Sequence, residues 1–420
     1  MGRWSVAALI LNFVIGASVF GLPKETSALL GPLSPWVYVA AGAAILCIAA
    51  CFAEVSSYFD QTGGPYLYAR EAYRPFLGIL VAWLLVLVRV ASIAANANLL
   101  TPYLGQIIPH LDTPLARGLI ITGFLWTIAA LNILGVKSGA MTSNAFAWIK
   151  VGVLVLFIVA GAIFWMRHGA TAPPQALRPP TLGSWFEATL LLIFGYGGFE
   201  AAIVPMAEAK DPKRDAPIAI FSVVCMAIVL YTLAQVIVVH TFPGASTSAR
   251  PISEASPVSL GSVGPTIIGI GAALSIIGYL VANLLSGPRV LYAFAERGDA
   301  PAFLARTHAR FRTPAVAIVL FTLATWVVAL KGNFRYGALL SAVARLAIYG
   351  LVCASVFVFR KRELAGRRFS GAPVFAILGL GICGILLTRM NWMEAAVLAI
   401  FVALSALTRV TNRRKVTANP

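Results

Sequence analysis

The feature that most constrains this chain is a succession of twelve long apolar runs divided by short polar segments. Of the 420 residues, 60% are hydrophobic and only 11% are charged, about half the charged fraction of a soluble domain. Since a membrane-spanning helix uses roughly 20 mostly apolar residues, twelve such helices would take up nearly all the apolar residues. The sequence therefore predicts an all-α polytopic membrane protein. Its runs are continuous rather than alternating, which excludes a transmembrane β-barrel.

The boundaries of the twelve predicted transmembrane helices follow the ends of the apolar runs. We expect them near residues 4–30, 35–60, 75–104, 116–134, 142–166, 186–208, 216–242, 264–293, 314–331, 336–359, 372–388 and 392–408. Longer loops, rich in proline, serine and threonine, are expected at about 167–184 and 243–263. Most loop lysines and arginines fall on the side that holds both ends of the chain. The positive-inside rule therefore predicts a multi-pass protein of the inner (cytoplasmic) membrane with cytoplasmic N- and C-termini.

The net charge of +17 does not indicate nucleic-acid binding, because the cations are spread over short loops and form no basic face. The lipid bilayer is the expected partner instead. Five cysteines, odd in number and without CxxC spacing, lie in apolar runs and indicate neither a disulfide framework nor a metal site. None of the four histidines has a second ligand three or four residues later. No metal, cofactor or enzymatic activity is therefore expected.

The first and sixth runs each carry small residues near the middle of the predicted span. Run 1 reads L-N-F-V-I-G-A-S-V-F-G-L-P over residues 11–23, and run 6 reads L-I-F-G-Y-G-G-F-E over residues 192–200. Glycine weakens a helix, and open backbone is tolerated in a membrane only where it is buried in protein or lines a cavity. An opened helix offers N–H groups that attract anions and carbonyls that attract cations. A zwitterion, with a carboxylate and an ammonium, fits both.

Small residues also allow close helix packing, and a single helix of this kind would favour that interpretation. Two interrupted helices, the first and the sixth, indicate a 5+5 inverted repeat with a binding site between its halves. Helices 1–5 and 6–10 would form the repeats, with discontinuous helices 1 and 6, and helices 11 and 12 would be an addition. In residue numbers, we expect the first repeat at 1–166, the second at 186–360 and the last two helices at 372–408.

Four stretches of the chain resemble motifs of the amino acid–polyamine–organocation (APC) transporter family, which has the leucine-transporter-type fold. G-A-S-V-F-G-L-P at 16–23 is similar to the family's G-S/T-G-I-F-x-x-P. A-E at 53–54 with G-G-P-Y-L-Y at 63–68 resembles the family's A-E-(x)n-G-G-x-Y-x-Y. F-G-Y-G-G-F-E at 194–200 resembles the family's F-x-x-x-G-F-E. R-V-L-Y-A at 289–293 with R-G-D-A-P at 297–301 is similar to the end of the family's eighth helix. The resemblance covers nearly the whole chain and implies one transporter domain over 1–420.

The resemblance implies secondary active transport of amino acids or related amines by alternating access. By position it assigns the substrate site to Gly16, Ala17, Ser18, Val19, Phe194, Tyr196, Gly197 and Gly198. Backbone amides around Ala17 to Val19 would hold the substrate carboxylate. Carbonyls near Phe13, Val14 and Phe194 would hold its ammonium. Phe194 would also cover the bound substrate, while Tyr196 and the two glycines after it would bound the side-chain pocket.

Ionisable groups inside a span cost about 2.5–3.5 kcal/mol on translocon scales and are functional candidates by default. Lys150 lies inside run 5, and the resemblance places it beside the broken first helix, where sodium binds in sodium-coupled relatives. Burial favours the neutral amine of a lysine over its ammonium, so a lysine there can exchange a proton. Our hypothesis is that Lys150 carries the coupled proton. The alternative is that it tethers carbonyls near Gly16.

Glu200 follows the glycines of run 6 directly after Phe199. Its carboxylate either caps the N–H groups that the break frees or responds to pH and links the site to the gate. Arg89 and Arg345 lie inside runs 3 and 10. We expect both to be internal cations that are either paired with a carboxylate or bonded to carbonyls, with Glu200 or Glu187 as candidate partners.

Asn96, Asn98 and Asn283 are amides in apolar surroundings. Each either bonds the substrate side chain or joins helices, and Asn283 is kept as a candidate substrate-binding residue. No acidic cluster points to a cationic substrate, so a neutral amino acid is favoured.

Proton-coupled uptake of an amino acid, with protons as the coupling ion, is the preferred hypothesis. An amino acid exchanger and a polyamine or amine transporter on the same fold are the alternatives. A channel is disfavoured because the polar groups cluster at two breaks and form no continuous stripe. The sequence leaves the oligomeric state open.

Overall fold

The computed structural model describes residues 14, 16–59, 63–108, 111, 113–135, 140–171, 173–202, 212–362 and 369–417. All regular secondary structure in these residues is helical. Within them, eight helical stretches are long and apolar enough to cross a bilayer, and three shorter apolar helices accompany them. The chain is therefore a multi-pass membrane protein, as the apolar runs predict.

The helices follow the predicted runs closely, because main chain in an apolar surrounding must bond within its own helix. Ten runs each correspond to one helix: α3 (Ser34–Ser56), α5 (Pro75–Ile107), α6 (Pro114–Ile133), α7 (Ala140–His168), α10 (Pro212–Thr241), α13 (Gly264–Glu296), α14 (Ala315–Lys331), α15 (Phe334–Lys361), α16 (Ala372–Leu387) and α17 (Trp392–Thr417). Run 1 contains the 3₁₀ helix η1 (Ala17–Phe20) and α2 (Leu22–Leu30), and run 6 contains α8 (Leu182–Tyr196) and α9 (Phe199–Ala202). Residues 4–13 of run 1 lie outside the described residues.

Short helices also form where the sequence predicts loops. They are α4 (Pro65–Ala72), α11 (Pro251–Ala255) and α12 (Pro257–Leu260), with the 3₁₀ turns η2 (Gly31–Leu33), η4 (Pro243–Ser246), η5 (Gly261–Val263) and η6 (Ala302–Ala305). The three α-helices each carry proline in the first turn, a position that tolerates proline because the first N–H groups of a helix have no partner. The loop predicted at 243–263 is thus partly helical.

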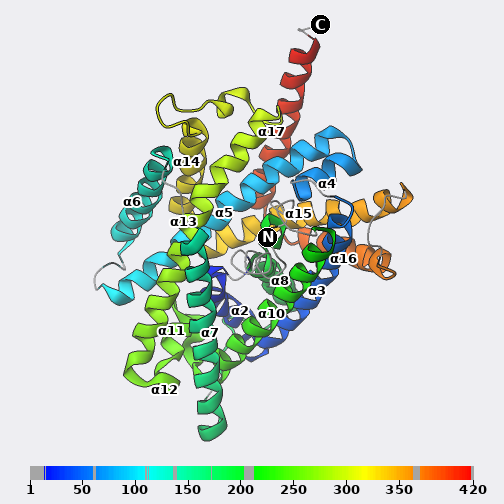
Figure 1. The fold of residues 1–420 in the computed structure, drawn as a ribbon. Helices are drawn as coiled ribbons and strands as arrows, with labels where there is room; N and C mark the ends of the chain where they lie inside the picture. Colours follow the sequence, from blue (N-terminus) through cyan, green and yellow to red (C-terminus); the bar gives the residue numbers. More distant parts are fainter. Residues whose placement is uncertain are drawn as a thin grey trace.

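Helix α8 lies in the middle of the bundle, where α2, α3 and α15 pack against it (Figure 1). The long α5 crosses the molecule and packs against α15 and α13. Helices α6 and α14 lie together at one side, and α16 packs beside α3 and α15. The interrupted run 6 is therefore surrounded by other helices rather than placed at the surface.

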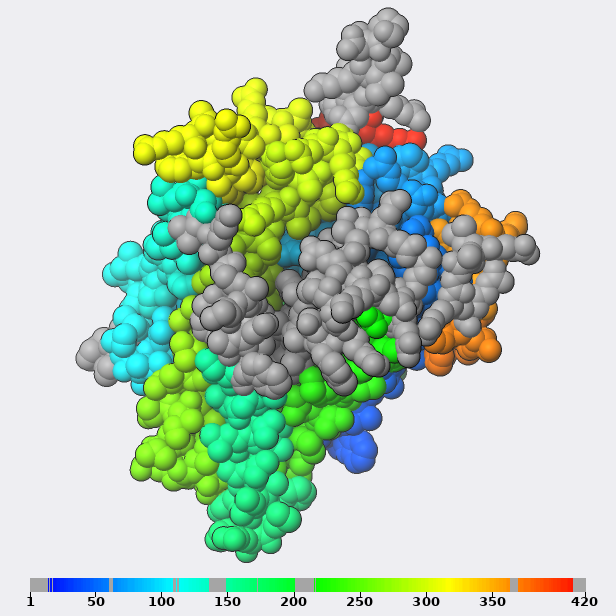
Figure 2. Space-filling view, viewed as in Figure 1, coloured from blue at the N-terminus to red at the C-terminus, as the bar shows by residue number. Residues whose placement is uncertain are grey.

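The periphery of the bundle is apolar. Helices α6 and α7 lie at the outer surface of the face shown in Figure 2. Leu115 and Leu119 of α6 are 73% and 64% exposed, and Met166 of α7 is 77% exposed. Large apolar side chains exposed at this density mark a surface that contacts something other than water, here the lipid.

Helices α5 and α15 cross at close range. A Cβ atom added to Gly337 would lie 2.8 Å from the amide nitrogen of Ala95 and 2.9 Å from the carbonyl oxygen of Ala91. Beside this contact, the hydroxyls of Ser92 and Ser341 are hydrogen-bonded at 2.8 Å. Small residues at a membrane helix interface allow the two backbones to approach and bond. This crossing fixes the face of α5 that carries Ser92 against α15.

We predict that Gly337→Ala lowers the melting temperature of the purified protein, because the new methyl group meets backbone atoms that cannot turn away. Overpacking of this kind costs about 1–3 kcal/mol. The matched control is Gly381→Ala in α16, where an added Cβ meets no atom within 4 Å and the better helix propensity of alanine is expected to leave stability equal or higher. Equal melting temperatures for both variants would contradict the close crossing.

Candidate substrate-binding site

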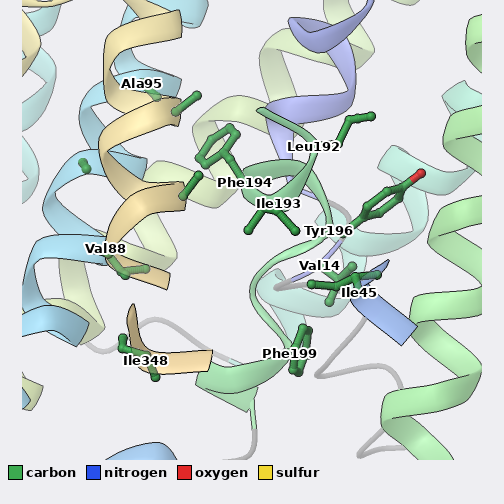
Figure 3. Packing of buried hydrophobic residues seen from close by; sticks show 14 of the residues in the cluster. Val14, Ile45, Val88, Ala95, Leu192, Ile193, Phe194, Tyr196, Phe199 and Ile348 are labelled. Carbon is green, nitrogen blue, oxygen red and sulfur yellow. The ribbon is translucent and has the colours of Figure 1, made fainter. Parts of the chain in front are cut away.

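Helix α8 ends at Tyr196, inside the core. Gly197 is extended, with φ −72° and ψ 168°. Gly198 has a φ of 118°, a value that residues other than glycine rarely adopt. The helix resumes as α9 at Phe199. Figure 3 shows Phe194 and Tyr196 projecting to opposite sides of the chain at this point. The interruption expected in run 6 is therefore present at two adjacent glycines.

A buried ion pair satisfies the polar main chain at the break. The Gly198 N–H donates to Glu200 Oε2 at 2.7 Å, and Arg345 Nε donates to Glu200 Oε1 at 2.8 Å. Arg345 Nη1 also donates to the Phe194 carbonyl at 3.1 Å, while the Tyr349 hydroxyl donates to Glu200 at 2.9 Å. The carboxylate thus makes the capping contact that the sequence suggested, and the guanidinium binds the end of α8.

Arg345 lies directly against the break. A Cβ atom added to Gly197 would lie 2.5 Å from Arg345 Nε, so a larger residue here would displace the guanidinium. Arg345 is 5% exposed and Glu200 is 1% exposed. Of the two candidate partners from the sequence, Arg345 pairs with Glu200, whereas Glu187 pairs with Arg335.

The main chain of run 1 is also interrupted. Gly16 is extended, with φ −80° and ψ −169°, directly before η1. The Val14 carbonyl accepts the Gly16 N–H at 2.7 Å and the Tyr231 hydroxyl at 3.0 Å. The Tyr103 hydroxyl donates to the Phe20 carbonyl at 3.1 Å. Tyrosines of α10 and α5 thus supply bonds that a continuous helix would have supplied itself.

Three separate cavities lie near these breaks. The smallest, called the break cavity below, has a volume of about 10 Å³ and is lined by Val14, Gly16, Ser18, Asn96, Phe194, Gly197, Tyr279 and Arg345. The first vestibule, of about 280 Å³, also has Tyr279 and Arg345 in its lining, with Tyr66, Arg89 and Glu200. The second vestibule, of about 420 Å³, is lined by residues that include Lys24, Glu25, Phe334 and Arg335.

The break cavity is closed toward both vestibules. Its volume is near the 10–15 Å³ that roughly one water molecule needs. Tyr279 and Arg345 separate it from the first vestibule, since both line the two spaces. Phe194 and Phe334 separate it from the second vestibule, and their rings pack edge to face with centroids 6.0 Å apart. A solute larger than water would enter only when one of these pairs moves.

The structure brings part of the predicted substrate site together. The predicted residues that line the break cavity are Gly16, Ser18, Phe194 and Gly197. Those that line the first vestibule are Gly198 and Asn283. Val19 and Tyr196 are buried in the packed core outside these cavities, and the Tyr196 hydroxyl donates to the Tyr38 carbonyl at 3.0 Å. The side chain of Ala17 and the whole of Phe13 lie outside the described residues.

The candidate proton-coupling residues lie on different helices, Lys150 on α7 and Glu200 on α9. Lys150 is 1% exposed on α7, a helix that packs against α10 and α13. Glu200 lies at the break itself. Arg89 donates to Ser286 Oγ at 3.2 Å and to Asn283 Oδ1 at 3.5 Å, so its described bonds are to neutral groups.

Three lining residues of the break cavity were not assigned to the site from the sequence: Asn96, Tyr279 and Arg345. The signal for Asn96 is its spacing from Arg89 and Ser92, which places all three on one face of α5. Arg89 and Ser92 line the first vestibule, and Asn96 continues this polar face into the break cavity.

Residues that line each vestibule take part in charged contacts. At the first, the Tyr66 hydroxyl donates to Asp299, and Arg70 pairs with the same carboxylate at 3.2 Å. Burial and the hydrogen bond to Asp299 raise the pKa of Tyr66, so its hydroxyl stays a donor near neutral pH. At the second, Arg335 pairs with Glu25 of α2 and Glu187 of α8 and so ties both interrupted runs to the start of α15.

The sequence model of the amino acid permease family matches residues 1–411. The chain belongs to the amino acid permease family. It is similar to the serine/threonine exchanger SteT of Bacillus subtilis (strain 168), with 26% identity over 388 residues that cover 90% of this chain and 87% of SteT. The permease is accordingly a transporter and not an enzyme.

Two further relatives from the same bacterium have similar coverage. The branched-chain amino acid permease BcaP is 25% identical over 418 residues, which cover 94% of this permease and 88% of BcaP. The methylthioribose transporter is 25% identical over 406 residues, which cover 91% and 86% of the two chains.

We predict that Glu200→Ala strongly destabilises the permease, because it leaves the Arg345 guanidinium buried without its carboxylate. Loss of one member of a buried ion pair costs about 3–5 kcal/mol, measured here as a lower melting temperature and a lower yield of monodisperse protein. The control is Glu254→Ala, which removes a partly exposed pair with Arg250 of the kind worth about 0–1 kcal/mol. An equal fall in melting temperature in both variants would contradict a larger structural role for the buried Glu200–Arg345 pair.

Proposed function

We propose that the permease moves neutral amino acids across the inner membrane by alternating access, with the coupled movement of protons. The observation that carries this proposal is the closed break cavity, which lies at two main-chain interruptions and between two larger vestibules. A carrier of this kind would open either the Tyr279–Arg345 pair or the Phe194–Phe334 pair, one at a time. A bound solute would then be exposed first to one vestibule and then to the other.

The proposal includes twelve spans and the 5+5 inverted repeat, and helix packing supports it. Four helices of the first five runs each pack against the helix five runs later: α2 against α8, α3 against α10, α5 against α13, and α6 against α14. Helices α5 and α13 are each 33 residues long. Contacts between corresponding helices are what a two-fold axis in the membrane plane would produce. The repeats would span 1–166 and 186–360, with 372–408 added.

The substrate would bind at the interruptions. Main-chain amides at Ala17, Ser18 and Val19 would hold its carboxylate, because the first N–H groups of a helix lack intrahelical partners. Phe194 would cover it. We propose Gly16 and Gly197 as the walls of the site and Gly198 and Asn283 as its extension toward the first vestibule. Tyr196 would then act from behind the wall by fixing the end of α8.

The charge of the vestibules favours a zwitterion over a cation. The first vestibule is lined by Arg89, Arg289, Arg297 and Arg345 with Glu200 as the carboxylate among its lining residues. Such surroundings repel a polyamine. Two relatives carry names that refer to neutral amino acids, serine and threonine in one and branched-chain amino acids in the other. Both observations support a neutral amino acid.

Exchange is the second candidate function, because one relative is named a serine/threonine exchanger. Symport and exchange differ in what they require. A symporter accumulates amino acid when only a proton gradient is present, whereas an exchanger needs amino acid on the opposite side of the membrane. Uptake into proteoliposomes with and without internal amino acid separates the two.

We predict that Lys150→Gln abolishes proton-driven accumulation in proteoliposomes, because a neutral amide carries no exchangeable charge at the buried position. Counterflow of amino acid without a gradient is expected to persist, since the substrate site is left in place. The control is Lys331→Gln at the exposed end of α14, which is expected to accumulate normally. Full gradient dependence in Lys150→Gln would remove this role from Lys150.

A second test concerns alternating access. In a background with Cys47, Cys51, Cys225, Cys353 and Cys383 replaced by alanine, we introduce Val88→Cys or Leu99→Cys. Both positions are in α5 and are 4% exposed, but Val88 lines the first vestibule and Leu99 the second. Adding L-serine is expected to change their reaction rates with a water-soluble maleimide in opposite directions. High reactivity of both positions at once would instead indicate a channel.

A further inference from the structure

Asn96, which lines the break cavity, carries a buried side-chain oxygen without a hydrogen-bond partner among the described residues. The side chain is 1% exposed and lines the cavity together with Ser18 and Gly197. Its Nδ2 donates to the Ser92 carbonyl at 2.8 Å, while its Oδ1 has no hydrogen-bond partner among the described residues. Leaving a polar atom buried and unsatisfied costs about 1–3 kcal/mol, so such atoms in a native protein call for a ligand or water.

The orientation of this amide follows from its surroundings. Exchanging Oδ1 and Nδ2 would place the side-chain oxygen against the Ser92 carbonyl oxygen, where two acceptors would face each other. The amide nitrogen therefore stays on the main chain of α5. The oxygen is the unbonded group of a side chain that lines the cavity, and it can only accept a hydrogen bond.

The carbonyls expected to hold the substrate ammonium are largely occupied. The Val14 carbonyl already accepts two hydrogen bonds, from the Gly16 N–H and the Tyr231 hydroxyl, which use both of its lone pairs. The Phe194 carbonyl accepts a charged hydrogen bond from Arg345. Among the described polar atoms of the cavity lining, Asn96 Oδ1 is thus the acceptor that needs a donor.

We propose that Asn96 Oδ1 is a primary acceptor for the α-ammonium of the transported amino acid. The assignment rests on the proposed function, because it takes the substrate to be an amino acid bound at the interruptions. The carboxylate would lie at the amides of η1 and the ammonium at the face of α5. Asn96 then selects α-amino acids over acids of similar shape that lack the ammonium.

Asn98 provides the matched comparison on the same helix. Its Nδ2 donates to the Ala94 and Ala329 carbonyls, both at 2.9 Å, and its Oδ1 accepts from Arg117 Nε at 2.8 Å. All of its polar atoms are therefore used within the protein. Asn98 joins α5 to α14 and α6, whereas Asn96 keeps an acceptor free.

The test measures dissociation constants of the purified permease for L-alanine, L-serine, L-threonine and L-leucine. Asn96→Leu, which is close in size, and Asn96→Ala, which leaves a space, both remove the acceptor. A hydrogen bond to a charged group corresponds to a roughly 10- to 100-fold weaker affinity when lost. Because every amino acid carries the same ammonium, the loss is expected to be similar for each one that the unchanged protein binds.

Asn98→Leu is expected to lower the melting temperature while leaving these dissociation constants within about twofold. Unchanged affinities in both Asn96 variants would overturn the assignment, and so would a loss confined to the hydroxylated amino acids, which would indicate a side-chain contact. Failure of the unchanged permease to bind any of the four would overturn the proposed neutral amino acid specificity as well. That outcome is distinct from normal binding that survives in the Asn96 variants.

Discussion

Main chain that cannot bond within its own helix, buried in an apolar bundle, is the constraint on which the site depends. Every unbonded N–H or C=O there would cost several kcal/mol. The structure meets this demand with side chains from other helices: Arg345 of α15, Tyr231 of α10 and Tyr103 of α5. A buried ion pair such as that of Arg345 with Glu200 adds little net stability, because desolvation offsets its attraction. Its value lies in holding the open main chain in one geometry.

The groups that cover the interruptions also form the wall toward the first vestibule. The Tyr279 ring of α13 lies 3.5 Å from where a Cβ atom of Gly16 would be, and the Arg345 guanidinium lies against Gly197. Both side chains line the break cavity and the first vestibule. Opening this wall therefore disturbs the contacts that stabilise the interruptions. Access to the site and the conformation of its main chain are coupled by the same two side chains.

The helices could be predicted from the sequence because each is specified locally by a long apolar run. The interruption at Gly197 and Gly198 could be predicted for the same reason, since glycine acts on its own main chain. Short helices such as α11 and α12 could not, because they lack apolar runs and depend on the packing of the loop. The partner of Arg345 is a long-range choice between Glu200 and Glu187, and only the fold decides it.

Asn96 and Asn98 show the same limit within a few residues of chain. Both are buried amides on α5, and the sequence gives no reason to treat them differently. What separates them is the neighbour each one faces. Asn98 meets the Ala329 carbonyl and Arg117, while Asn96 faces a space. The distinction between a structural amide and a binding amide is therefore a property of the assembled bundle and not of the helix that carries them.

The charged residues around the site explain why a neutral amide is suited to bind the ammonium. Arginines outnumber carboxylates in the lining of the first vestibule, and Lys24, Arg117 and Arg335 accompany Glu25 in the second. Such surroundings draw a carboxylate and oppose an isolated cation. An ammonium can be held between them only if it arrives attached to a carboxylate and finds an acceptor shielded from the guanidinium groups. Glu200 is already bound to Arg345 and Gly198, so a neutral amide oxygen can bind the ammonium of a zwitterion without adding the negative charge that would retain a free cation.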